Sequence, residues 1–136
     1  MAAERILEHP VWGDRLIVLV SAEESGGELF RFEYVSHPGR SSVWPSRVSP
    51  AARAATPAPD DHVHAEQEER VLVLAGTLRC RVAGREHLLG VGQSLIVPAG
   101  VPHAVWNAGA SGSRSIGEFR PARDTQAMLE AYFVAA

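Results

Sequence analysis

Residues 92–107, GQSLIVPAGVPHAVWN, place a histidine directly behind a rigid turn. Residues 94–97 (SLIV) are mostly apolar and end in two β-branched residues, which is typical of a short strand. Two prolines then fix φ, and Gly100 between them is free to adopt a positive φ. His103 follows this turn at the start of the next predicted strand. A side chain on so constrained a backbone has a defined direction, which a ligand on a rigid element requires.

A second histidine-bearing stretch, DDHVHAEQEE, covers residues 60–69. On an extended chain successive side chains point to opposite faces, so His62 and His64 project to the same side. The rise per residue separates them by roughly 7 Å along the strand, so both imidazoles can converge on one ion. Strand parity favours Glu68 as a further ligand, because it is in phase with His64. A bend would bring in Glu69 instead, and the periodicity leaves both open.

Most of the remaining chain alternates short strands with Gly and Pro turns. Period-two or β-branched segments predict strands at 16–20, 28–35, 71–74, 77–82, 86–89, 94–97, 103–106 and 113–119. Such a series indicates an all-β sandwich or barrel in a single domain over residues 1–136. The C-terminal segment alone predicts a helix, capped by Asp124 or Thr125. Its predicted apolar face contains Met128, Leu129, Tyr132 and Phe133.

A segment rich in Pro, Ala and Ser, at about residues 36–61, interrupts this pattern. A short strand is expected at 42–44, but the repeated prolines argue against a longer one. Loops of this length inside a compact domain are uncommon, and they are either functional lids or disordered segments. Both interpretations stay open here. Trp44 lies on the loop, where it would serve as a lid residue or as a plug that anchors the loop.

The composition and charge exclude several classes of function. The formal net charge is −3 and the pI is about 6.0, so the chain lacks the basic footprint of a nucleic-acid-binding protein. No segment approaches the roughly 18 consecutive apolar residues that cross a bilayer. The acidic N-terminal sequence MAAERILE differs from a secretory signal, and the single cysteine, Cys80, forms no internal disulfide. We therefore expect a cytoplasmic protein with neither nucleic-acid nor membrane partners.

The two histidine stretches together resemble the cupin superfamily. The first cupin motif is HxH, three or four residues, Glu, six residues and Gly, and here the spacing to Gly76 selects Glu69 over Glu68. The second motif is matched at every position, by Gly92, Pro98, Gly100, His103 and Asn107. The fifteen residues between Gly76 and Gly92 are the short form found in small microbial, cupin 2 type members. One departure is Thr56, which stands where a Gly usually opens the first motif.

The resemblance implies a double-stranded β-helix, the cupin or jelly-roll barrel, with a short C-terminal helix. It also implies one metal ion, held by His62, His64, Glu69 and His103. Three neutral imidazoles and one carboxylate suit a divalent transition metal, namely Fe, Mn, Ni, Co, Cu or Zn. Four protein ligands leave two positions of a six-coordinate ion for water or substrate. A purely structural zinc site is less favoured, because such sites are usually rich in cysteine.

Cupin metal centres serve many reactions, so the resemblance alone implies only a broad function. The leading hypothesis is a metal-dependent enzyme acting on a small carbonyl-, enol- or phenol-bearing molecule, of the cyclase, isomerase, lyase or dioxygenase type. Candidate catalytic residues are Tyr34 and Glu68, and candidate pocket residues are Trp44, Trp106 and Glu118. A packing role for Tyr34 and a solvated position for each acid are the plain alternatives. The rival hypothesis is a non-catalytic module that binds a small ligand. Cupins commonly pair through sheet edges, so a homodimer is expected.

Overall fold

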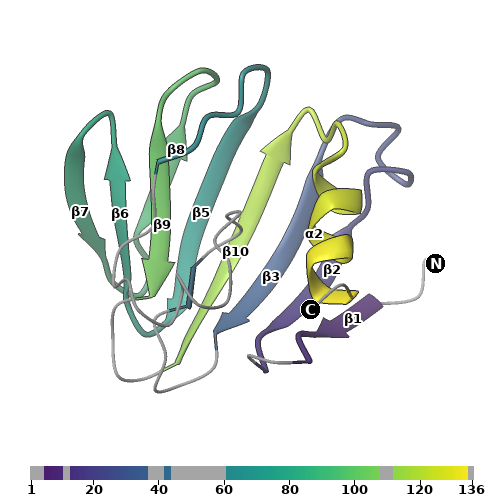
Figure 1. The fold of residues 1–136 in the computed structure, drawn as a ribbon, viewed down its shortest axis with the longest axis horizontal. Coiled ribbons are helices and arrows are strands. Elements are labelled where there is room, and N and C mark those ends of the chain that lie inside the picture. Colours follow the sequence, from purple (N-terminus) through teal and green to yellow (C-terminus); the bar gives the residue numbers. More distant parts are fainter. Residues whose placement is uncertain (1–4, 11–12, 37–41, 44–60, 108–111, 135–136) are drawn as a thin grey trace.

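The computed structural model describes residues 5–10, 13–36, 42–43, 61–107 and 112–134. Within these ranges the chain forms strands and one C-terminal helix (Figure 1). The elements are β1 (Arg5–Glu8), β2 (Arg15–Val20), β3 (Phe30–Ser36), β4 (Ser42–Val43), β5 (Glu68–Ala75), β6 (Leu78–Val82), β7 (Arg85–Leu89), β8 (Ser94–Val97), β9 (His103–Asn107), β10 (Ser113–Arg120) and α2 (Thr125–Val134).

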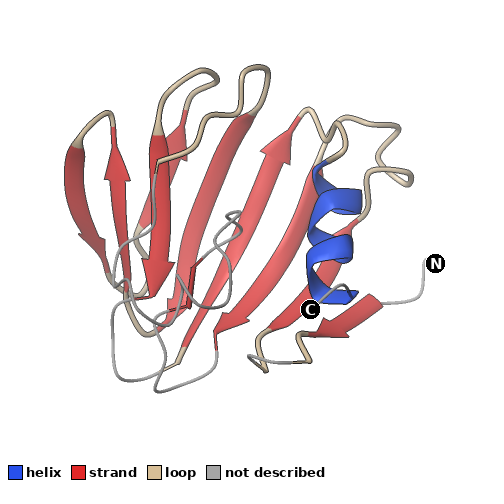
Figure 2. Ribbon diagram, viewed as in Figure 1, coloured by secondary structure: helices blue, strands red, loops and turns tan. Residues whose placement is uncertain are grey.

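The strands form two antiparallel sheets. The larger sheet has the order β1-β2-β3-β10-β5-β8, and the smaller has the order β4-β9-β6-β7. Strands that are far apart in the sequence are neighbours in both sheets, as Figure 2 shows for β3, β10 and β5. This arrangement confirms the predicted all-β jelly-roll fold with a short C-terminal helix. Its topology also places β5 and β9, which follow or contain the two histidine stretches, in different sheets.

The alternating sequence of β3 fixes which face of the large sheet is buried. Phe30, Phe32 and Tyr34 are at most 1% exposed, whereas Arg31 and Glu33 between them are half-buried. The rings of Phe30 and Phe32 stack 4.8 Å apart, and Phe32 stacks in turn on Phe119 of β10. The predicted period of two is therefore confirmed. Apolar side chains on this face form the core, which continues through Leu16, Val18, Val71, Val73, Leu78, Cys80, Leu89 and Val105.

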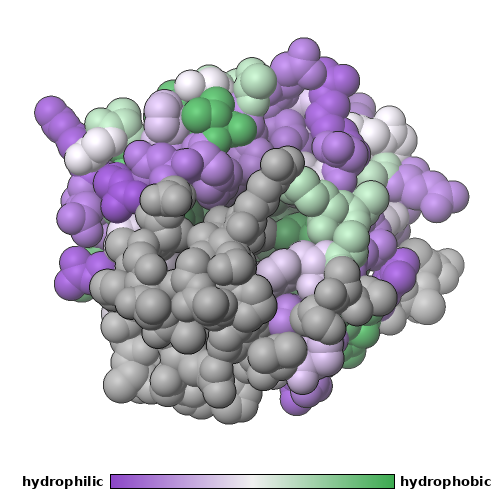
Figure 3. Space-filling model, in the orientation of Figure 1, coloured by the Kyte–Doolittle hydropathy of each residue, from purple (hydrophilic) through white to green (hydrophobic). Residues whose placement is uncertain are grey.

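Helix α2 covers the inner face of the large sheet near β1, β2 and β3 (Figure 1). Leu129 and Phe133 are 2% exposed and belong to the core, and the Phe133 ring lies edge-on to Tyr34. Met128 is 41% exposed, so the apolar stripe of the helix is narrower than the sequence predicted. None of the helical residues described here forms a segment long and apolar enough to span a membrane. On the face shown in Figure 3, most of the described surface is hydrophilic.

Two strands test the limits of the sequence prediction. Sequence patterns did not predict β1, whose sequence is RILE. In the structure this strand has no buried face, and Ile6 is 56% exposed. It forms through pairing with β2. The short strand expected at 42–44 is confirmed for Ser42–Val43, which pair with β9. Trp44 and most of the predicted long loop lie outside the described residues.

Candidate metal centre

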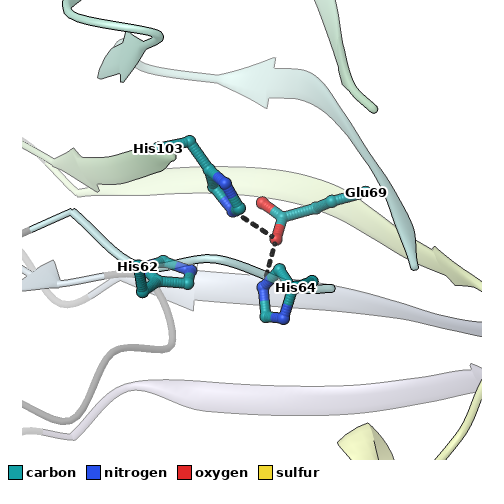
Figure 4. Close-up of side chains that lie close together, drawn as sticks. All are labelled: His62, His64, Glu69 and His103. Carbon is teal, nitrogen blue, oxygen red and sulfur yellow. Dashed lines mark hydrogen bonds and ion pairs between the residues drawn. The ribbon is translucent and has the colours of Figure 1, made fainter. Parts of the chain in front are cut away.

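Four side chains from distant parts of the sequence converge inside the fold (Figure 4). His62 and His64 precede β5, Glu69 lies on β5, and His103 opens β9. Their candidate ligand atoms all lie within 4.8 Å of one another. Glu69 and His103 are each 1% exposed, and His62 and His64 are partly buried. The structure therefore brings together the four ligands that the sequence motifs predict.

Backbone hydrogen bonds hold the two histidine stretches side by side. The amide of His62 donates to the carbonyl of His103 (2.8 Å), and the amide of His103 donates back to His62 (2.9 Å). The amide of Gly100 donates to the carbonyl of His64 (2.8 Å). Gly100 has the positive φ of 80° that the sequence anticipated. The rigid turn before His103 is thus the element that fixes the first pair of histidines.

A bend in the backbone selects Glu69 over Glu68. Residues 65–66 form a turn, and β5 begins only at Glu68, so the strand parity counted from His64 does not continue. The side chain of Glu68 points to the opposite face of β5, where it accepts a hydrogen bond from Arg70 (2.9 Å). Gly76, which marks the motif spacing, has φ 74°, and a Cβ there would lie 2.6 Å from the carbonyl oxygen of Gly112.

The charge on Glu69 is stabilised by its imidazole neighbours. The Oε1 atom lies 3.2 Å from His103 Nε2 and 3.1 Å from His64 Nε2. Burial alone would raise the pKa of Glu69, but interactions with His103 and His64 lower it to about 2. The carboxylate is therefore ionised, and it can offset part of the charge of a cation.

The histidines differ in their protonation. Burial and the nearby His103 lower the pKa of His62 to about 4, so this ring is neutral at pH 7 with a free lone pair. Burial has the largest single effect on the pKa of His103 and lowers it, but the hydrogen bond and charge of Glu69, with the Val101 carbonyl and Asp61, together raise it by more, so the net shift is upward. His103 Nδ1 donates to the carbonyl of Val101 (2.8 Å), which directs Nε2 toward the cluster.

Three buried polar atoms of the cluster form no hydrogen bond with any described residue. His62 Nδ1, His64 Nε2 and Glu69 Oε2 have no hydrogen-bond partner. The 3.1 Å contact between His64 and Glu69 is an ion-pair distance without hydrogen-bond geometry. Such atoms are uncommon in folded proteins, where nearly all buried polar groups are paired. A set of imidazole nitrogens and one carboxylate with unused lone pairs fits a divalent transition metal ion.

The other predicted site residues that the structure describes have their contacts outside this cluster. The Tyr34 hydroxyl donates to Asp14 (2.9 Å) in a buried position close to α2. Glu118 lies on the outer face of β10, where Arg31 and Arg120 donate to its carboxylate. Trp106 and His103 point to opposite faces of β9, and the Trp106 ring packs against the guanidinium of Arg81. The catalytic and pocket roles of these residues, and of Trp44, stay predictions.

Sequence patterns do not single out two buried polar residues near these positions. Asp14 is fully buried and accepts a hydrogen bond from the Tyr34 hydroxyl, although it lies 20 residues earlier in the chain. Gln67 is 8% exposed and lies between the second and third candidate ligands. Its place inside the first motif is the only signal in the sequence that draws attention to it.

Comparison with known proteins agrees with this geometry. A family model described as "Cupin domain" matches residues 48–114, the part of the chain that contains all four candidate ligands. This chain belongs to the cupin superfamily. No curated protein sequence matches this cupin. Among solved structures, an RmlC-like cupin from Shewanella frigidimarina NCIMB 400 is 22% identical, with a TM-score of 0.62 over 90% of this chain and 88% of that one.

Two further solved structures show how widely this fold is used. A predicted oxalate decarboxylase from Thermotoga maritima is 15% identical, with a TM-score of 0.62 over 88% of this cupin and 92% of that chain. The cupin domain of an XRE family transcriptional regulator from Enterobacter cloacae is 19% identical, with a TM-score of 0.57 over 81% and 98% of the two chains. At these identities the likeness shows the fold, and the function must be argued from the site.

Proposed function

We propose that this cupin holds one divalent first-row transition metal ion and is an enzyme that acts on a small carbonyl-, enol- or phenol-bearing molecule. The observation that carries the proposal is the set of three imidazoles and one carboxylate, with Glu69 and His103 buried and the other two histidines partly buried, in which three polar atoms are unpaired. When bound, the ion supplies Lewis-acid chemistry at a substrate oxygen or a water molecule. Reactions of the cyclase, isomerase, lyase or dioxygenase type all belong to this range.

The protein's own residues prepare the site for a cation. His62 is neutral at pH 7, so binding an ion there requires no loss of a proton. Glu69 is ionised and contributes a negative charge inside a buried cluster, where electrostatic attraction is stronger than in water. The carbonyl of Val101 holds the ring of His103 in one orientation. Four protein ligands leave two positions of a six-coordinate ion for water or substrate.

The apolar surroundings of the cluster favour an organic substrate. The ring of Phe119 meets His64 edge-on, with ring centroids 5.0 Å apart. Phe32 stacks on Phe119, and these two phenylalanine rings are fully buried. Such a wall excludes water from one side of the candidate ligands and strengthens polar interactions made there.

Metal analysis of three proteins tests the first half of the proposal. Protein purified without chelators or metal affinity resin should contain about one transition metal ion per chain by mass spectrometry. His103→Ala should lose most of it, because the variant removes a nitrogen ligand. His87→Ala is the matched control, since His87 lies exposed on β7 outside the cluster. The absence of metal in the parent protein, even after incubation with each candidate ion, would refute the proposal.

A second candidate function is a non-catalytic module that binds a small ligand through the same metal. It is favoured by the position of the predicted acids and bases, because Tyr34, Glu68 and Glu118 each interact with a partner outside the cluster. Protein loaded with Mn²⁺ should enhance the relaxation of water protons, and a bound oxygen-bearing compound should reduce this enhancement. Formation of product from such a compound, followed by NMR, supports the enzyme. Saturable binding without product supports the module.

The oligomeric state and cellular location belong to the same proposal. We expect a cytoplasmic homodimer that pairs at an edge of the large sheet. Strand β8 ends that sheet, and Ile96 on β8 and Leu72 on the adjacent β5 are 50% and 37% exposed. Light scattering coupled to size-exclusion chromatography measures the mass directly. A mass of one chain at all concentrations would contradict the dimer and would leave the metal centre unaffected.

A further inference from the structure

The turn between His64 and Glu69 decides which carboxylate joins the metal centre. If this segment were fully extended, Glu68 and not Glu69 would lie on the same side as His64. A shift of one residue in a strand sends every side chain to the other face. The turn at residues 65–66 prevents that outcome, so its conformation must be fixed by contacts.

The side chain of Gln67 supplies such contacts. Its amide nitrogen lies 3.0 Å from the Pro121 carbonyl oxygen, 2.9 Å from the Ala122 carbonyl oxygen and 2.6 Å from Thr125 Oγ1. The two amide hydrogens are therefore shared among three acceptors. Gln67 is 8% exposed, and hydrogen bonds in such a buried position are costly to lose. These bonds join the turn to the segment that links β10 to α2.

The two ends of the turn are held by other elements. Gly100 donates to the carbonyl of His64 at one end, and Glu69 pairs with Phe119 and Val97 at the other. Within the turn itself, Glu66 forms a 3.6 Å ion pair with Arg123, but both side chains are more than half exposed. Exposed ion pairs of this kind contribute little to stability. Among these contacts, the buried amide of Gln67 is the one that can fix the middle of the turn.

We infer that Gln67 is a positioning residue for the metal centre, whose amide fixes the turn that brings Glu69 to the three histidines. This inference rests on the proposed function, since it concerns a ligand of the proposed metal. It also makes the start of α2 part of the support for the site, through Thr125. Gln67 itself lies outside the four-residue cluster, and it acts through Glu69.

The experiment compares two glutamine variants on the full chain. Gln67→Met keeps the length of the side chain and removes its donor. Gln126→Met is the matched control, because Gln126 also joins α2 to another segment, by accepting a hydrogen bond from the Ala22 amide (2.8 Å). Calorimetric titration of metal-free protein with Co²⁺ should show Kd raised at least about tenfold in Gln67→Met, as for other outer-shell changes. Gln126→Met should bind Co²⁺ as the parent protein does.

The visible absorption of bound Co²⁺ gives a second readout that a loss of stability alone would not change. In Gln67→Met its bands should shift or change in intensity, because the position of the Glu69 ligand changes. Equal affinity and equal spectra in Gln67→Met and the parent protein would overturn the inference while the proposed function stands. Failure of the parent protein to bind Co²⁺ or any other candidate ion would overturn the proposed function, and the inference with it.

A milder pair of variants keeps the test decisive if Gln67→Met does not fold. Thr125→Val removes one acceptor of the Gln67 amide and leaves the others in place. It should weaken Co²⁺ binding by a smaller factor, and Thr125→Ser, which retains the hydroxyl, should restore it. If Thr125→Val and Thr125→Ser both bind Co²⁺ like the parent protein, the link from α2 to the metal centre is refuted.

Discussion

Two buried glutamates on neighbouring strands have opposite surroundings. Glu69 on β5 and Glu118 on β10 are 1% and 6% exposed. Glu118 faces outward, and both of its oxygens accept hydrogen bonds from arginines, Oε1 from Arg31 (2.6 Å) and Oε2 from Arg120 (2.7 Å). Glu69 faces inward among imidazoles, and its Oε2 atom has no partner. Both carboxylates are ionised, but only the charge of Glu118 is fully matched by the protein.

This contrast separates a structural ion pair from a candidate ligand set. The arginines beside Glu118 always carry a positive charge, so this outer carboxylate needs nothing further. The imidazoles beside Glu69 can be neutral, and they then offer lone pairs in place of charge. These imidazoles stabilise the Glu69 carboxylate, but they leave its Oε2 atom unpaired, and a bound cation would match the remaining charge. Burial of an acidic residue therefore does not by itself identify a site, whereas the chemistry of its partners does.

The largest expected difference between the two glutamates is in metal affinity. Glu69→Gln should raise the Kd for Co²⁺ by at least about a hundredfold, because it removes the one anionic ligand, a larger loss than an outer-shell change causes. Glu118→Gln should leave this Kd unchanged. Calorimetric titration of metal-free protein measures both. Equal losses in the two variants would mean that the contrast in their surroundings has no bearing on metal binding.

Thermal unfolding should separate the two glutamates in the same way. At a free metal concentration about 100-fold above Kd, binding to the native state should stabilise it by about 2.7 kcal/mol. The parent protein and Glu118→Gln should both gain this stability, seen as a rise in Tm that EDTA reverses. Glu69→Gln should show no such rise. A metal-dependent rise in Glu69→Gln as large as that of the parent protein would place the binding site elsewhere.

A smaller effect is expected on the stability of the metal-free protein. Glu118→Gln should lower the free energy of unfolding by about 1 kcal/mol, because it weakens hydrogen bonds to a nearly buried charge whose arginine partners are partly exposed. Glu68→Gln is the control, since the side chains of Glu68 and its partner Arg70 are 34% and 48% exposed. Urea titration should show almost no change in that variant. A larger loss for Glu68→Gln than for Glu118→Gln would contradict this ranking.

The smallest expected effect is the pH dependence of the stability difference between the parent protein and Glu118→Gln. Burial raises the pKa of Glu118, but the interactions with Arg120 and Arg31 lower it by more. The pKa of Glu118 is therefore below its ordinary value. A lowered native pKa adds stability above the unfolded pKa of about 4.3, and this stability is lost as the pH falls through the native pKa. The stability gap between the parent protein and Glu118→Gln should therefore be full at pH 7 and shrink on acidification. Urea titrations of metal-free protein across this range measure it, and a constant gap would assign the effect to packing.

The alternation of the strands predicted the all-β fold because it is a short-range pattern, and the resemblance to the cupin motifs supplied the four candidate ligands. The alternation in β3 defines its buried face without reference to any other strand. The two histidine stretches contain their own turns, so the spacing of the motifs carries over directly to the structure.

Features that depend on pairing between distant segments could not be predicted in this way. Tyr34 meets Asp14 across two elements, and no periodicity in β3 indicates that partner. Glu118 alternates correctly along β10, but which face of that strand is the inner one follows from its pairing with β3 and β5. The choice between Glu68 and Glu69 depends on the turn at residues 65–66, and the adjacent Gln67 donates a hydrogen bond to Thr125, which lies far along the chain.

Anomalous diffraction from crystals of the metal-loaded protein shows whether the four candidate ligands hold an ion. Data collected on either side of the absorption edge of the bound metal locate the ion without assumptions about its ligands. We expect one strong peak per chain, at an ion bonded to His62, His64, Glu69 and His103. A peak at another position, or no peak at these four residues in protein shown to contain metal, would contradict it.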